Sequence, residues 1–270
     1  MSAHVVLIDA LNLIRRIYAV QERPFLFNGE LAENTQQQVL HNTVQACAQA
    51  LQNIISQLEP THALAVFDSE APCFRYALYP DYKKGRAKMP EHLANKMNDI
   101  QDVFLDLGVD SLIPDEDEAD DVIATLSIKV ALRNQRVTIV STDKAFLTLL
   151  NDNIQVYDYF NRRYLDADYV KQKFSVGPDK LLDLWTLTGD TTNKIPGVAG
   201  IGQVTAAQLL DEHGSLAAIK NAEHIKPAVR KKLDENQSQM HLSRQLLTLK
   251  QDIPLGFNLK DIRLSQQPVE

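Results

Sequence analysis

Along the first part of the chain, short runs of apolar strand formers alternate with longer segments whose apolar residues recur at helical spacing. The strand-like runs lie at 5–8, 63–67, 108–113, 137–140 and 154–157. Helical spacing covers 36–58, 91–107 and 119–132. This alternation is typical of βαβ units, so we predict an α/β fold whose parallel sheet is covered by helices on both faces.

An aspartate follows each of the three strongest strand-like runs. Asp9 comes directly after the first run, Asp68 directly after the second, and Asp143 shortly after the third. In open α/β sheets the ligand site lies beyond the carboxyl ends of the strands. We therefore expect these three carboxylates to converge on one crevice.

The character of the chain changes near residue 176, where helical segments joined by loops rich in Gly, Pro and Thr begin. We predict an α/β domain over 1–175 and a helical domain over 176–256. The last residues, 257–270, are expected to form a surface extension or a frayed tail.

Composition indicates a folded protein without identifying its activity. The 270 residues are 44% hydrophobic, which allows a substantial core, and no apolar run approaches the roughly 20 residues that span a bilayer. The N-terminus does not read as a signal peptide, and two cysteines, Cys47 and Cys73, are too few for a disulfide framework. We expect a cytoplasmic protein with reduced thiols and no membrane partner.

The formal net charge of −7 argues against a protein that coats nucleic acid indiscriminately. An acidic run at 115–121 stands just before a helical pattern. Such a run complements the helix dipole, and taken alone it is more often a solvated face than a site. Here Glu118 and Asp121 share one helical face, and the apolar residues Val122 and Ile123 place that face near the core.

Carboxylates gathered near a core repel one another unless a cation neutralises them. Their hard oxygens suit Mg²⁺ or Mn²⁺, and a metal-bound water can attack a phosphodiester while the metal stabilises charge on the phosphate. The sequence contains no HExxH motif and no P-loop, which disfavours a zinc hydrolase and nucleotide-driven chemistry.

Two further stretches suggest contacts with nucleic acid. Residues 75–88 include five basic residues and three tyrosines, which suits phosphates and stacked bases, although a solvated basic loop explains this stretch alone equally well. Residues 195–210 read as a glycine-containing turn that opens a helix, where free amides could bind phosphate without reading bases. Together with the acidic crevice, they point to duplex DNA.

These motifs resemble the 5′-nuclease superfamily, which includes flap endonucleases, phage 5′-exonucleases and the N-terminal domain of bacterial DNA polymerase I. The motifs that carry the resemblance are the Asp9 strand with Arg15 and Arg16, Phe67-Asp68, 74–86, 118–121, 141–143 and 189–206. The resemblance implies a PIN-like sheet, an arch or clamp at 72–97, and a C-terminal helix-three-turn-helix module that binds DNA. With no polymerase domain appended, the chain is most similar to short stand-alone bacterial members.

The resemblance also implies roles for individual residues. Residues of the first metal cluster are Asp9, Asp68, Glu118, Asp120 and Asp121. The catalytic basic residues of the arch are Lys83 and Arg86. Carbonyl groups that bind K⁺ belong to Leu187, Thr188, Pro196, Val198 and Ile201. Candidate DNA contacts are Arg75, Tyr82, Lys83, Lys84, Arg86, Gly200, Ile201, Gly202, Gln203, Val204 and Thr205.

The second metal cluster departs from the family pattern. Asp143 and Asp190 are present, but Ala145 and Asn193 stand where the family usually has aspartates. Losing two carboxylates should weaken a second cation, and two-metal chemistry with it. The short bacterial members are known for such an eroded cluster, so the departure fits that subgroup.

The leading hypothesis is a monomeric, structure-specific DNA nuclease that uses Mg²⁺, with Mn²⁺ as a substitute, to cut 5′ flaps, junctions or 5′ ends in replication and repair. The alternative is a catalytically weak or inactive protein that binds flaps and junctions. A haloacid-dehalogenase-like phosphatase would need a second Asp at position 11, where Leu11 stands. A PIN-type ribonuclease shares the acidic crevice but does not need the hairpin.

Overall fold

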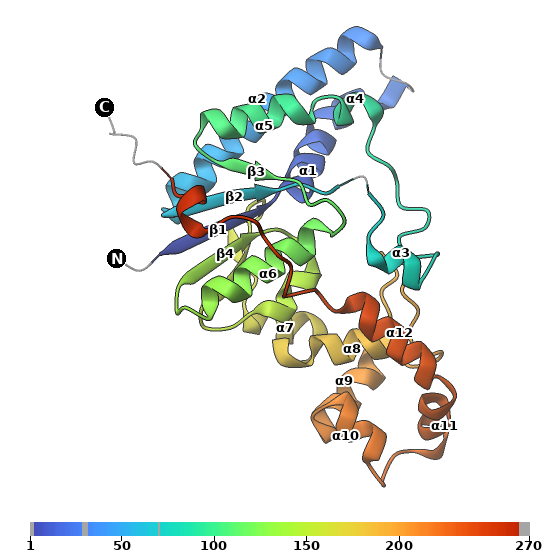
Figure 1. The fold of residues 1–270 in the computed structure, drawn as a ribbon. Coiled ribbons are helices and arrows are strands. Elements are labelled where there is room, and N and C mark those ends of the chain that lie inside the picture. The colour runs from blue at the N-terminus through green and yellow to red at the C-terminus, as the bar shows by residue number, and fades with distance from the viewer. Residues whose placement is uncertain (1–2, 29–31, 70, 265–270) are drawn as a thin grey trace.

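The structure is a computed structural model that describes residues 3–28, 32–69 and 71–264. At its centre lies a six-stranded sheet of order β3-β2-β1-β4-β5-β6 (Figure 1). The strands are β1 His4–Asp9, β2 His62–Val66, β3 Asp110–Leu112, β4 Arg136–Val140, β5 Ile154–Asp158 and β6 Arg163–Tyr164. Neighbouring strands are parallel except β5 and β6, which are antiparallel. The predicted α/β fold is confirmed, with one antiparallel edge strand that the sequence analysis did not predict.

The central strand β1 shows why its sequence is apolar without interruption. Val5 and Leu7 belong to the core on one face of the sheet, and Val6 and Ile8 belong to the core on the other. Successive side chains of a strand point to opposite faces, so a strand that is covered on both sides must be apolar at every position.

Helices cover the two faces of this sheet (Figure 1). On one side lie α1 (Ala10–Glu22), α2 (Glu33–Leu58), α4 (Glu91–Ala94) and α5 (Met97–Asp106). On the other side lie α6 (Ala119–Ala131) and α7 (Ala167–Phe174). The helix expected over 91–107 is interrupted at residues 95 and 96, so it forms the separate helices α4 and α5.

Short elements connect these layers. They are α3 (Phe74–Leu78) and the 3₁₀ turns η1 (Arg23–Asn28), η2 (Lys144–Leu149) and η3 (Pro178–Lys180). Most of the expected arch segment, 72–97, is therefore turn and extended chain rather than long helix. Among the described residues, no helix is both long enough and apolar enough to cross a membrane.

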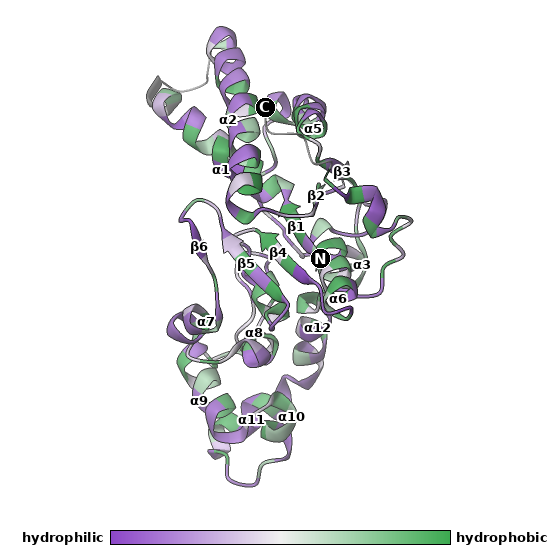
Figure 2. Ribbon diagram, turned by 90° about the vertical axis from the view of Figure 1, so that its left-hand side faces the viewer, coloured by the Kyte–Doolittle hydropathy of each residue, from purple (hydrophilic) through white to green (hydrophobic). Residues whose placement is uncertain are grey.

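The C-terminal part is helical and extends the molecule away from the sheet (Figures 1 and 2). Its helices are α8 (Leu181–Thr188), α9 (Gln203–His213), α10 (Leu216–Asn221), α11 (Pro227–Glu235) and α12 (Gln237–Leu247). Leu184, Leu187 and Leu210 from these helices belong to the same hydrophobic core as Leu7 of β1. One continuous core therefore fixes the helical part against the sheet.

After α12 the chain returns to the sheet and ends in a 3₁₀ turn, η4 (Leu259–Ile262) (Figure 1). Ile262 is buried, Arg263 forms an isolated antiparallel bridge with His62, and the Leu264 amide donates to the Thr61 carbonyl at 3.1 Å. Apart from Ile262, the described residues of this segment are exposed or half-buried, as in a surface extension. The buried Ile262 side chain and these hydrogen bonds attach the segment to the edge of the sheet.

Candidate active site

The carboxyl ends of β2, β1 and β4 lie side by side, because these strands are neighbours in the sheet. Asp9 is the last residue of β1 and is in register with Val66 of β2. Asp68 and Asp143 follow the ends of β2 and β4 within three residues. The structure therefore brings the three strand-end aspartates to one edge, as the strand pattern predicts.

Hydrogen bonds hold the Asp9 side chain in place, but it has no cationic partner among the described residues. Burial, together with the charges of Asp68 and Asp143, raises the pKa of Asp9 to about 7, although the hydrogen bond from the Ser141 hydroxyl acts in the opposite direction. The Ser141 hydroxyl donates to Oδ2 at 2.7 Å, and the Asn12 amide donates to Oδ1 at 3.2 Å. These hydrogen bonds orient the carboxylate, yet no cationic side chain pairs with it among the described residues.

Asp120 reaches the same region from the first turn of α6. Burial raises the pKa of Asp120 well above its ordinary value, and the negative charges of Asp143, Asp9 and Asp68 act in the same direction. The nearby Lys83 only partly opposes this effect. A cluster of acids that destabilise one another's charged forms is the electrostatic condition that a divalent cation relieves.

Some of these acids are engaged by backbone amides. Asp68 Oδ1 accepts from the Ala119 amide at 3.3 Å, and Asp143 Oδ1 accepts from the Ala145 amide at 2.8 Å. In the described part of the chain, no three His, Cys, Asp or Glu side chains stand together as a ready metal cage. A hydrated Mg²⁺ fits this donor set, because it keeps several waters and needs only one or two direct carboxylates.

A narrow crevice of about 30 Å³ runs through the acidic region. Its lining includes Glu118 and Asp120 of the predicted first metal cluster and Asp143 and Asp190 of the predicted second cluster. Its volume is close to that of one water molecule, so a DNA phosphate would have to approach from outside rather than enter.

Glu118 is enclosed by three donors. Lys83 Nζ lies 2.5 Å from Oε1, Arg75 Nη1 lies 2.7 Å from Oε2, and the Tyr82 hydroxyl donates to Oε2 at 3.1 Å. Burial raises the pKa of Glu118, but the charges of Lys83 and Arg75 outweigh it and lower that pKa overall. The Lys83 amide also donates to the Asn193 carbonyl at 2.9 Å, which fixes the turn of Lys83 beside the crevice.

Asp121 and Arg75 form a buried pair that corrects two of the predicted roles. The Asp121 side chain is fully buried, and Arg75 donates from Nη1 to Oδ2 at 2.6 Å and from Nη2 to Oδ1 at 2.8 Å. The Lys250 amide donates to the same carboxylate at 2.8 Å. Asp121 therefore does not face the crevice as the expected metal ligand, because its oxygens are occupied by these donors.

Arg75 is likewise unable to reach DNA as expected, because it is only 2% exposed. Its guanidinium also donates to the carbonyls of Leu246 (2.8 Å) and Thr248 (2.9 Å). Tyr82, another expected DNA contact, is 4% exposed and belongs to the same buried group. These side chains join α3, α6 and the segment after α12.

Lys84 and Arg86 are exposed, as a contact with DNA requires. Lys84 pairs with Asp81 at 2.7 Å. This pair is exposed and therefore weak, so a DNA phosphate could take the place of the Asp81 carboxylate. Arg15 lies close by: burial and the charge of Arg86 lower its pKa, and the charge of Asp68 opposes them. Arg15 also donates to the Ala87 carbonyl at 2.8 Å, so the basic segment is tied to α1.

The predicted glycine turn precedes α9 and presents its first residues outward. Gly200 has a φ of 74°, Gly202 precedes the helix without a side-chain cap, and Val204 is 73% exposed. Gly202 and Gln203 are also exposed, and Thr205 is half-buried. Ile201 is the exception, since its side chain is buried in the core and only its backbone could meet a ligand.

Three of the five carbonyls expected to bind K⁺ already accept hydrogen bonds. The donors are the Val198 amide to Leu187 (2.8 Å), the Ile201 amide to Val198 (3.0 Å) and the Ser243 hydroxyl to Pro196 (2.5 Å). A carbonyl oxygen has two lone pairs, so these bonds leave room for a cation. The K⁺ site, including the Thr188 carbonyl, stays a prediction.

Asp190 lines the crevice but has three donors of its own. It is 3% exposed and accepts from Lys144 Nζ (2.9 Å), the Thr192 amide (3.1 Å) and Asn193 Nδ2 (2.9 Å). Lys144 is a residue that the sequence reasoning missed, although it directly follows Asp143.

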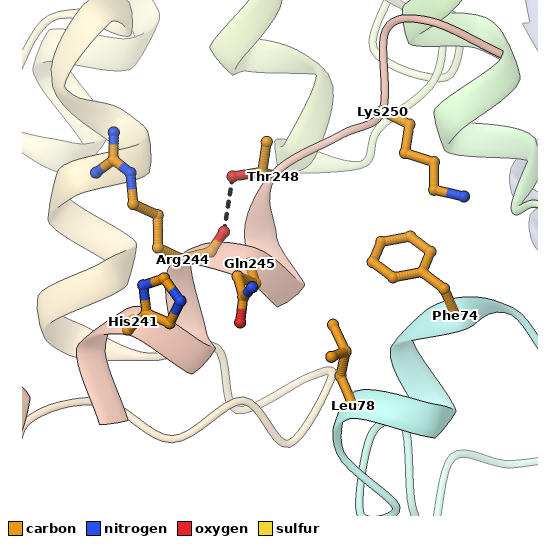
Figure 3. A pocket seen from close by; sticks show the side chains of 7 residues that line it. All are labelled: Phe74, Leu78, His241, Arg244, Gln245, Thr248 and Lys250. Carbon is orange, nitrogen blue, oxygen red and sulfur yellow. Dashed lines mark hydrogen bonds between the residues drawn. The ribbon is translucent and has the colours of Figure 1, made fainter. Parts of the chain in front are cut away.

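A larger hollow of about 370 Å³ lies between α3 and α12 (Figure 3). Its lining residues are Phe74, Leu78, His241, Arg244, Gln245, Thr248 and Lys250. Arg244 and Lys250 are each paired with an aspartate, Asp183 and Asp117. None of the predicted site residues lines this hollow, so it is separate from the acidic crevice.

The sequence families that match the chain identify this arrangement. Residues 4–175 match the 5′-3′ exonuclease N-terminal resolvase-like domain, and residues 176–270 match the 5′-3′ exonuclease C-terminal SAM fold. The chain belongs to the 5′-3′ exonuclease family. These matches confirm the predicted membership of the 5′-nuclease superfamily. They also confirm the expected class of enzyme, a 5′-nuclease.

Individual relatives agree with this assignment. The flap endonuclease Xni of Colwellia psychrerythraea is 64% identical over 270 residues, which cover 98% of this chain and 93% of the relative. The flap endonuclease Xni of Photobacterium profundum is 44% identical over 265 residues, which cover 97% of this chain and 98% of the relative. The expected similarity to short bacterial members of the family is confirmed.

Solved structures share the fold. A T5 5′-exonuclease with bound zinc ions has a TM-score of 0.74 at 19% identity, over 91% of this chain and 89% of the other. A T5 D15 flap endonuclease variant in complex with DNA and metal ions has a TM-score of 0.70 at 20% identity, over 91% and 89%.

Proposed function

We propose that the chain is a structure-specific, Mg²⁺-dependent DNA nuclease that hydrolyses phosphodiesters at 5′ flaps or 5′ ends during replication and repair. The observation that carries the proposal is the group of strand-end and helix-start acids whose mutual repulsion and burial raise the pKa values of Asp9 and Asp120. The names of the relatives, flap endonuclease Xni, support the flap substrate. The metal and DNA complexes of the T5 enzymes support the cofactor and partner.

The residues proposed to bind the metal are Asp9, Asp68 and Asp120, with Glu118 reached through water. When bound, a hydrated Mg²⁺ supplies a water of lowered pKa and positive charge for the phosphate; Mn²⁺ can take its place. Its charge also removes the repulsion among the acids, so binding is coupled to loss of their protons. Asp121 is left out of this set because Arg75 occupies its carboxylate.

Lys83 and Arg86 are the proposed catalytic cations of the arch segment. Lys83 Nζ is paired with Glu118 at the crevice, where its ammonium can turn to a phosphate oxygen that approaches. Arg86, exposed and close to Arg15, extends the positive charge beyond the crevice. Together with the exposed Lys84, these side chains neutralise phosphate charge without reading base sequence.

The turn before α9 is the proposed grip on duplex DNA. Its uncapped amides at Gly202 and Gln203 are suited to a phosphate, and the exposed Val204 can lie against the backbone. K⁺ bound by carbonyls of the same turn would stiffen it. The chain is proposed to act as a monomer in the cytoplasm, where its buried Cys47 and Cys73 remain reduced.

A cleavage assay tests the proposal. A 5′-flap DNA is incubated with the chain while Mg²⁺ or Mn²⁺ is titrated, and Asp120→Asn is compared with Asp115→Asn, an exposed acid of the same run. We expect metal-dependent cutting near the flap junction that only Asp120→Asn abolishes. Flap binding without cutting at any metal concentration would instead support the alternative, a catalytically inactive flap-binding protein.

A further inference from the structure

The Lys144 side chain is paired with Asp190, one of the two acids that remain in the predicted second metal cluster. Its Nζ lies 2.9 Å from Asp190 Oδ1, and Asp190 is 3% exposed. Its ammonium lies 5.1 Å from the centre of the Trp185 ring, which supports the stem of the side chain in this direction. Both Lys144 and Asp190 line the acidic crevice with Asp143 and Asp120.

The other neighbours of Asp190 are donors as well. Asn193 Nδ2 donates to Oδ2 at 2.9 Å, and the Thr192 amide donates to Oδ1 at 3.1 Å. A divalent cation on this carboxylate would displace an ammonium and disrupt these hydrogen bonds. Because Ala145 and Asn193 stand where the family usually has acids, Asp143 is the other carboxylate of the predicted second cluster that remains for such a cation.

The net charge on this side of the crevice also disfavours a second divalent cation. Asp143, Asp190 and Lys144 together carry one net negative charge, too little to hold a strongly hydrated divalent cation in a site that is already narrow. The ammonium gives this side of the crevice a permanent positive charge that does not depend on metal concentration. Lys144 follows Asp143 in the sequence and lines the same crevice, so the charge lies on the acidic side where a DNA phosphate would approach.

We propose that the Lys144 ammonium serves in place of a second divalent cation: it neutralises Asp190 and presents a positive charge to the phosphate of the DNA. This inference rests on the proposed nuclease function. It assigns the chain one metal site, at Asp9, Asp68 and Asp120, and makes Lys144 a binding residue for the phosphate.

The test compares Lys144→Met with Lys144→Arg, which keeps the charge, and with Lys171→Met, an exposed lysine on α7. Mn²⁺ binding without DNA is followed by calorimetry and by electron paramagnetic resonance. We expect one Mn²⁺ per wild-type chain, and a second, weaker binding event only in Lys144→Met, because Asp190 is then uncompensated. With a flap substrate, Lys144→Met should cut about 100-fold more slowly, and Lys144→Arg should keep most of the rate.

Thermal unfolding in EDTA gives a readout that does not need catalysis. Lys144→Met should unfold about 5–10 °C lower than wild type, because the buried Asp190 loses its partner, and Asp190→Asn in the same chain should restore much of the loss. Two equivalent Mn²⁺ sites in the wild type, or unchanged stoichiometry and stability in Lys144→Met, would overturn the inference. A wild type that cuts no DNA but shows the expected stability pattern would overturn the proposed function and keep the Lys144–Asp190 pairing.

Discussion

Removing the Arg75 side chain should be among the most damaging single changes in this protein. Arg75→Met keeps much of the apolar volume but leaves the Asp121 carboxylate, which is 0% exposed, with the Lys250 amide as its one remaining donor in the described part of the chain. It also removes the donors to the Leu246 and Thr248 carbonyls. Breaking a buried ion pair by removing one partner costs about 3–5 kcal/mol.

That cost is large compared with the total free energy of unfolding of a protein domain. The free energy of unfolding of a domain of ordinary stability is about 5–15 kcal/mol, so Arg75→Met should lose about a fifth of it or more. Part of the loss is returned when Asp121 takes up a proton and becomes neutral. Asp121→Asn combined with Arg75→Met should therefore be less destabilised than the sum of the two single changes, because the double variant leaves no buried charge unpaired.

Urea unfolding followed by circular dichroism measures these free energies, and Arg133→Met serves as the control because this exposed arginine makes a single long hydrogen bond, 3.4 Å. The control should change stability by less than about 0.5 kcal/mol. A loss below about 1 kcal/mol in Arg75→Met, or strict additivity with Asp121→Asn, would show that the buried pair does not contribute as argued.

Three further predictions concern metal, pH and DNA. The pKa of Asp9 is about 7 without metal, so below that pH protons compete with Mg²⁺ for the carboxylate. Mg²⁺ affinity should therefore rise from pH 6 to pH 8, with proton release that calorimetry can measure. Equal affinity at both pH values would contradict this coupling. Burial lowers the pKa of His4 to about 4 from an ordinary 6.5, so the folded state binds fewer protons than the unfolded state; its stabilising contribution is complete above pH 6.5 and is lost as the pH falls toward 4. His4→Gln, which can keep a hydrogen bond to Thr138, should flatten the stability curve over this window by up to about 3 kcal/mol in thermal or urea unfolding, and an unchanged curve would count against the shift. Val204→Asp should weaken binding to duplex DNA by about tenfold at low salt, measured by fluorescence anisotropy. Leu132→Asp, similarly exposed but at the C-terminal end of α6, should leave binding unchanged; similar losses in both would refute the assignment of the turn.

Local patterns in the sequence were sufficient for the frame of the site. The apolar runs before Asp9, Asp68 and Asp143 predicted parallel strands, because only strands covered on both faces remain apolar at every position. Parallel strands end at a common edge, so the convergence of these acids followed without any knowledge of distances. The start of α6, with Asp120 in its first turn, was also predictable, because the residues that begin a helix give a local sequence signal.

Contacts between distant segments were decided by the tertiary structure alone. Glu118 and Asp121 look equivalent in the sequence. Only tertiary packing brings Arg75 to both of them and aims Asp121 at the Lys250 amide after α12, 129 residues away. Lys144 likewise reads as a surface lysine until Asp190 is placed beside it. Periodicity determines which face of an element is buried, but the partner of a buried charge depends on which segments pack there, and one sequence pattern fits many such partners.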